Sequence, residues 1–120
     1  MELKSVMVRF AIISGLPDEQ VNKWIDICED AISEIKTHLK PGIDEKENEN
    51  RLCAAAASLS FYRYILFLAA REGVDSFSIG EFSVRSNKRT SVEAAHRIWL
   101  EAKAAVSEIL TNDDFSFKGV

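Results

Sequence analysis

The sequence predicts a mainly α-helical protein, a small bundle of about four helices with one β-hairpin inserted before the last helix. Over most of the 120 residues, apolar side chains recur at spacings of three and four, which is the period of a helix. Within residues 74–90 they recur at every second position, as in a strand. The length and a hydrophobic fraction of 47% predict a single domain, residues 1–120, with its own core.

Two helices are predicted in the first third of the chain, at about residues 1–13 and 17–40. The break between them contains Gly15, a common helix terminator, and Pro17, which suits a first helical turn. The second helix carries one continuous apolar stripe, which is expected to face the core. The stripe consists of Val21, Trp24, Ile25, Cys28, Ala31, Ile32, Ile35 and Leu39.

The third predicted helix, at about residues 47–72, is apolar on nearly all sides. This composition predicts a central helix that packs against neighbours on more than one face. Arg63 is the one charge in its middle, and we expect it to be an interface or snorkelling side chain. The segment 44–50, DEKENEN, has a net negative charge but lacks the glycine and the spaced oxygen ligands of a calcium-binding loop. We therefore expect a solvent-exposed loop that leads into the third helix.

Residues 74–90 are predicted to form an arm that consists of a β-hairpin and its flanking loops. The strands are expected at about residues 76–79 and 82–85, joined by Gly80 and Glu81 in a type II′ turn. The apolar positions of this hairpin are Phe77, Ile79, Phe82 and Val84.

A two-stranded hairpin is at best marginally stable in water, so this apolar ribbon needs a covering surface. Full burial of its four apolar side chains would contribute roughly 6–12 kcal/mol before entropy is subtracted. Two solutions are open: the hairpin folds back on its own helices, or it packs against a neighbouring subunit. The second solution predicts an oligomer, which closes into a ring if the rotation per subunit allows.

The last helix is expected to begin after Ser91 as N-cap and to be followed by a flexible C-terminal tail, residues 111–120. Phe115 and Phe117 in this tail are candidates for docking on a partner. The buried face of the helix is predicted to consist of Val92, Ala95, Ile98, Trp99, Ala102, Val106, Ile109 and Leu110.

The sequence carries no pattern that indicates catalysis, and we expect no enzymatic activity, cofactor or metal. His38 and His96 have no Cys or Asp at the spacing of a metal site or a catalytic triad. The five glycines are scattered singly, so no phosphate-binding loop is predicted. Cys28 and Cys53 lie in apolar helical contexts, and we expect buried free thiols there rather than a disulfide or half of a metal site.

Charge and hydropathy limit the partners that this chain can have. The net charge of −4 argues against the broad basic surface of a protein that wraps nucleic acid non-specifically. One basic cluster follows the hairpin, namely Arg85, Lys88 and Arg89. It either meets nucleic acid or an acidic partner, or keeps an exposed strand edge from aggregating. We expect no secretory signal and no run of about 18 apolar residues, and hence no membrane association.

Three stretches that together cover most of the chain carry a family resemblance. They are SGLPDEQVNKWIDICEDAISEI, AAAASLSFYRYILFLAAREGVDSFSIGEFSV, and AAHRIWLEAKAAVSEIL followed by FSFKGV. In this order they resemble the small head–tail connector proteins of tailed bacteriophages and prophages. The resemblance implies a structural subunit that assembles into a ring beneath the portal, with DNA passing through the channel without specific binding.

For this chain the resemblance implies subunit contacts through Phe77, Ile79, Phe82 and Val84. Arg85, Lys88 and Arg89 would face the neighbour, the portal or the DNA path, and the tail phenylalanines would dock on a portal or tail-side protein. The protein would then occur in the bacterial cytoplasm during assembly and afterwards in the virion. The residues themselves leave an alternative open: a dimeric bacterial helical module that uses the hairpin to dock on another protein.

Overall fold

The computed structural model describes residues 1–72, 77–79, 82–84 and 88–111, with side chains for residues 1–71 and 91–111. The described chain is mainly helical, which confirms the predicted class at that level. Its elements are α1 (Leu3–Ser14), α2 (Asp18–Val21), the 3-10 helix η1 (Asn22–Trp24), α3 (Ile25–Thr37), α4 (Glu49–Glu72), β1 (Phe77–Ile79), β2 (Phe82–Val84) and α5 (Lys88–Ala105).

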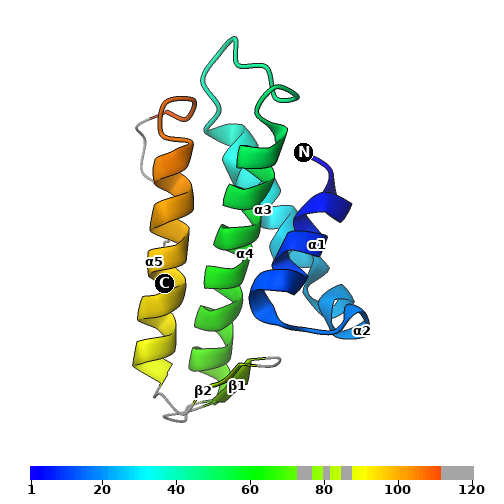
Figure 1. Cartoon of the computed structure of the whole chain (residues 1–120), viewed down its shortest axis with the longest axis vertical. Coiled ribbons are helices and arrows are strands. Elements are labelled where there is room, and N and C mark those ends of the chain that lie inside the picture. Colours follow the sequence, from blue (N-terminus) through cyan, green and yellow to red (C-terminus); the bar gives the residue numbers. More distant parts are fainter. Residues whose placement is uncertain (73–76, 80–81, 85–87, 112–120) are drawn as a thin grey trace.

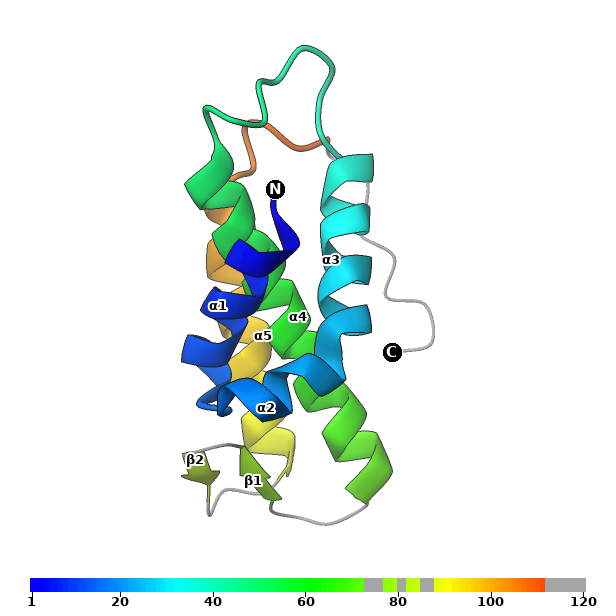
Figure 2. The ribbon, with the colours of Figure 1, turned by 90° about the vertical axis from the view of Figure 1, so that its right-hand side faces the viewer.

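Helix α4 is the centre of the bundle, as its apolar sequence predicts. It packs against α5 on one side and against α1 and α3 on the others (Figure 1). Figure 2 shows α1 and α3 on opposite flanks of the bundle, with α5 behind α4. Ala55, Ala56 and Ala57 are fully buried between α4 and its neighbours.

The length and composition of α4 also satisfy the criterion for a membrane-spanning helix, over Glu49–Arg71. The expectation that no segment of this sequence would reach that criterion is therefore wrong. Because 72% of the apolar window is buried inside the bundle, packing against three other helices accounts for this composition. The core helix of a soluble protein passes the same test, so the observation is only weak evidence for a membrane.

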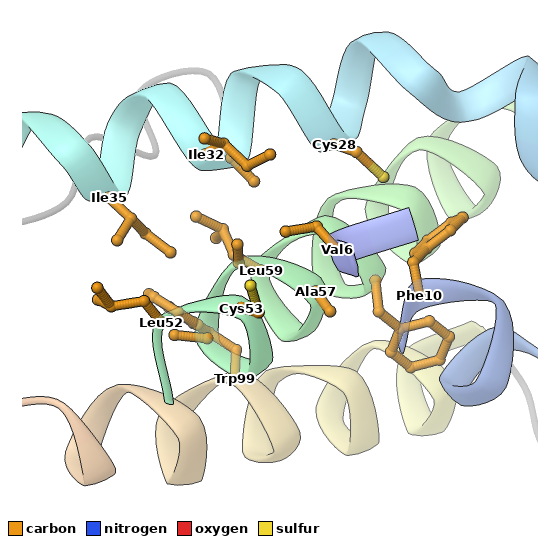
Figure 3. Close-up of a cluster of buried hydrophobic side chains, with 14 of the residues drawn as sticks. Val6, Phe10, Cys28, Ile32, Ile35, Leu52, Cys53, Ala57, Leu59 and Trp99 are labelled. Carbon is orange, nitrogen blue, oxygen red and sulfur yellow. The ribbon is translucent and has the colours of Figure 1, made fainter. Parts of the chain in front are cut away.

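The core contains side chains from all four long helices (Figure 3). Val6 and Phe10 come from α1, Ile35 from α3, Leu59 from α4 and Trp99 from α5, and each is at most 1% exposed. Ile35 and Trp99 belong to the apolar faces predicted for their helices, and both are buried as predicted.

The predicted helix at residues 17–40 is interrupted. Trp24 has φ −112° and ψ 19°, which is not helical, and it separates η1 from α3. The tighter winding of η1 shifts the side chains around the helix axis. As a result Ile25, predicted to be in the buried stripe, is 37% exposed, while Cys28, Ala31, Ile32 and Ile35 are buried as predicted.

Both ends of α5 differ from the prediction. The helix begins at Lys88, so Ser91 lies inside it, where its buried hydroxyl has no hydrogen-bond partner among the described residues. The helix ends at Ala105, yet the chain remains buried through Ile109 and Leu110. The predicted buried residue Ile98 is 37% exposed, because it lies beside the line of Ala95, Trp99 and Val106 that faces the core.

Candidate interaction surface

The two strands form an antiparallel ribbon between the end of α4 and the start of α5. We call this end of the bundle the hairpin end; in Figure 1 it is the lower end. Directly opposite residues of a ribbon share a face, as do residues two apart in one strand. The register pairs Phe77 with Val84, Ser78 with Ser83, and Ile79 with Phe82.

This register places the four apolar positions on one face of the ribbon and the two serines on the other. In the described part of the chain the sheet has two strands, so each strand has one outer edge. The connecting residues 80–81 lie outside the described residues, so the predicted turn type stays a prediction. The ribbon face remains the candidate subunit contact.

Other predicted site residues are only partly placed. Lys88 and Arg89 belong to the first turn of α5, next to the ribbon in sequence. Arg85, Phe115 and Phe117 lie outside the described residues. Their roles therefore remain predictions.

An aromatic cluster between η1 and α4 was not predicted from the sequence. The Trp24 ring makes edge contacts with Tyr64 and Phe67, at centroid distances of 4.7 Å and 5.4 Å. Tyr64 is buried and also contacts Phe10, whereas Phe67 is 46% exposed. The Arg71 guanidinium lies 5.8 Å from the centre of the Phe67 ring. The cluster thus extends from the core to an exposed ring with a cation beside it.

The local sequence explains this geometry. Phe67 follows Tyr64 by three residues and Arg71 follows Phe67 by four, so all three share one side of α4. Aromatic and arginine side chains are the types most enriched where binding energy concentrates at protein interfaces. No sequence signal marks Phe67 as exposed, because α4 is apolar on nearly all sides.

A second exposed apolar feature runs along α1. Lys4, Val8 and Ile12 follow one another at spacings of four and therefore lie on one line of the helix. Val8 is 53% exposed and Ile12 is 76% exposed. An open groove of about 460 Å³ lies here, and we call it the α1 groove. Its lining residues are Lys4, Ser5, Val8, Arg9, Ile12, Asn50 and Cys53.

The cysteines, Tyr64 and Arg63 have surroundings that are typical of packed core residues and helix contacts. Cys28 and Cys53 are buried free thiols, as predicted, and burial raises the pKa of each. Burial likewise raises the pKa of Tyr64. Arg63 pairs with Glu34 at 2.6 Å and so joins α4 to α3. Among the described residues no group of three His, Cys, Asp or Glu side chains could hold a metal ion.

The two histidines lie apart from these groups. His96 is exposed, and its ring lies 5.0 Å from the ring of Tyr62. His38 follows the last turn of α3, where its Nδ1 lies 2.9 Å from the Glu34 carbonyl oxygen. The His38 ring therefore takes part in capping the C-terminal end of α3.

Comparison with protein-family models, with curated proteins and with solved structures finds no match for this chain.

Proposed function

We propose that this chain is a non-enzymatic structural subunit of a phage or prophage head–tail connector, which assembles into a ring between portal and tail. The family resemblance supports this function, and the strand register is the structural observation that carries it. Four apolar positions lie on one face of a two-stranded ribbon at one end of a helical bundle. Such a ribbon is marginal alone and gains stability when another surface covers it.

In the proposed ring the apolar face of the ribbon packs against the next copy. The contact joins different surfaces of the two copies, so it repeats around the ring until the rotation closes it. The exposed Phe67 and the neighbouring Arg71, near the end of α4, add an aromatic and cationic contact at the same end of the bundle.

The charged residues fit the same arrangement. Arg85, Lys88 and Arg89 face the neighbouring copy, the portal or the DNA path, and Phe115 and Phe117 dock on a portal or tail-side protein. DNA must slide through the channel without being held, and a net charge of −4 suits this. The protein resides in the bacterial cytoplasm during assembly and then in the virion.

The test is a matched pair of substitutions on one strand. Phe82→Asp places a charge on the apolar face of the ribbon, and Ser83→Asp places the same charge on the opposite face. We expect Phe82→Asp to abolish higher-order assembly and Ser83→Asp to leave it, with unchanged far-UV circular dichroism in both. Light scattering and sedimentation velocity at rising concentration measure assembly, and negative-stain microscopy shows whether the particles are rings.

Two outcomes would contradict the proposal. If Phe82→Asp assembles like the unmodified chain, the ribbon face is not the subunit contact. If the unmodified chain is a dimer at every concentration and forms no rings, it is instead a helical interaction module whose hairpin docks on another protein.

A further inference from the structure

The α1 groove has the chemistry of a binding site for an acidic and aromatic peptide. Its exposed apolar residues, Val8 and Ile12, are flanked by the cations Lys4 and Arg9. No carboxylate belongs to its lining. A positive, apolar groove is notable on a chain whose net charge is −4. It therefore selects for a ligand that carries negative charge next to large apolar side chains.

The chain itself contains a segment of that chemistry. The structure describes residues up to Thr111, and the nine residues after it read NDDFSFKGV. Asp113 and Asp114 equal the two cations of the groove in number and carry the opposite charge. Phe115 and Phe117 follow them at once and match its two exposed apolar residues.

The position of Thr111 favours the groove of a neighbouring copy. The Thr111 amide donates to the His38 carbonyl oxygen at 2.7 Å, which holds the chain at the end of α3. Figure 2 shows α3 and α1 on opposite flanks of the bundle. The flank of α1 that faces α3 carries Leu3, which shares a cleft with Ile32. Thr111 is not among the residues that line the α1 groove, so the last described residue is held at the end of α3 and not in the groove of its own chain.

We propose that residues 112–120 of one copy bind the α1 groove of the next copy. This adds a second, sequence-distant contact to the ribbon contact, and it rests on the proposed function in requiring that copies of the chain meet. Asp113 and Asp114 pair with Lys4 and Arg9, and the two phenylalanines cover the exposed Val8 and Ile12.

The experiment links two full-length variants that differ in one cysteine each. Ser5→Cys places a thiol in the groove and leaves its cations and apolar residues intact, and Gly119→Cys places one beyond both phenylalanines. The two preparations, one enlarged by a tag, are mixed with a short bismaleimide. We expect a cross-linked heterodimer on a denaturing gel, because the two added thiols lie on different chains and a link between them joins two copies. Native Cys28 and Cys53 are buried and their raised pKa slows their reaction.

Three controls make the result specific. Leu100→Cys, on α5 and 47% exposed, should give no heterodimer with Gly119→Cys. The unmodified chain mixed with Gly119→Cys should give none either. Arg9→Glu in the groove chain, or Asp114→Lys in the tail chain, should abolish the product, and the two reversals together should restore it, since the charge pair is re-formed with opposite sign.

The proposal is overturned if Ser5→Cys gives no more product than Leu100→Cys, or if the charge reversals leave the yield unchanged. A double variant that carries both Ser5→Cys and Gly119→Cys tests for a link within one chain. The proposal is equally overturned if this double variant is linked within itself while the mixture of the two single variants gives no product. Rings without the cross-link would reject this contact and leave the connector function standing. A cross-link together with normal assembly of Phe82→Asp would reject the ribbon contact and leave this one.

Discussion

The two ends of the bundle are built in different ways. At the loop end, where α3 leads into α4, the chain that follows α5 is tied to α3 by backbone hydrogen bonds. The Lys40 amide donates to the Ile109 carbonyl oxygen at 3.0 Å, and Leu110 pairs with Leu39 as an isolated bridge. Leu110 is only 2% exposed. Backbone groups of Lys40, Ile109 and Thr111 have partners here, and Ile109 is buried like Leu110.

At the hairpin end a large apolar side chain is exposed. Phe67 is 46% exposed near the end of α4, with Arg71 beside its ring, and a short ribbon connects α4 to α5. Isolated exposed apolar residues are ordinary, but an aromatic ring, a cation and an apolar ribbon face at one end of a molecule indicate an interaction surface. The comparison teaches that the loop end is closed by contacts within a single chain, whereas the hairpin end carries the surface that we propose as the subunit contact.

The largest expected effect is at the loop end. Leu110→Ala removes a buried side chain that closes the bundle after α5, and it should lower the free energy of unfolding by about 2–5 kcal/mol. Urea denaturation followed by circular dichroism measures this. Assembly under native conditions should persist, because the substitution leaves the hairpin end unchanged. A loss well below that range would mean that the loop end is less tightly packed than its burial indicates.

A medium effect on stability is expected at the hairpin end, with a larger effect on assembly. Phe67→Ala loses its edge contact with Trp24 and should cost only about 1 kcal/mol of unfolding free energy. Assembly should nevertheless weaken strongly, as measured by sedimentation velocity. The matched control is Leu100→Ala, because Leu100 has a similar exposure of 47% but lies in the middle of α5. Equal assembly of both variants would show that the exposed ring has no part in the contact.

The sequence predicts the closed parts of the molecule better than the open ones. The spacing of apolar residues identifies Cys28, Ile32 and Ile35 because one face of α3 is buried and the other is not. Helix α4 has no such contrast, so its sequence does not show that Phe67 faces outward. The break before α3 depends on the backbone of Trp24, which no local pattern marks.

The proposed site divides along the same line. The alternation of apolar residues within residues 77–84 predicts the two strands. The register then shows that Phe82 and Ile79 share one face of the ribbon. The α1 groove could not be predicted, because Val8 and Ile12 read as ordinary members of an apolar helix. Whether a face is covered depends on a second molecule, which the local spacing in one chain does not specify.

The smallest expected effect concerns pH at the loop end. The hydrogen bond from Arg51, together with the positive charges of Arg51 and Lys40, lowers the pKa of Glu108 below its ordinary value. A carboxyl group whose pKa is lowered by folding stabilises the fold above its unfolded pKa of about 4.3, and this contribution is lost as the pH falls through the folded pKa. Because Glu108 is exposed, we expect the effect to be small and local.

Amide hydrogen exchange measured by NMR can detect it. In the unmodified chain the amides of Lys40 and Thr111 should be better protected at neutral pH than in Glu108→Gln. The ion pair with Arg51 ties the segment after α5 to α4, and the same segment forms the backbone bonds of these two amides. The difference should vanish once Glu108 is protonated, and amides near Phe67 should show no such change. If the unmodified chain and Glu108→Gln still differ in amide protection in acid, the protection comes from packing of Leu110 and not from the ion pair. The contrast between the loop end and the hairpin end would then depend on packing alone.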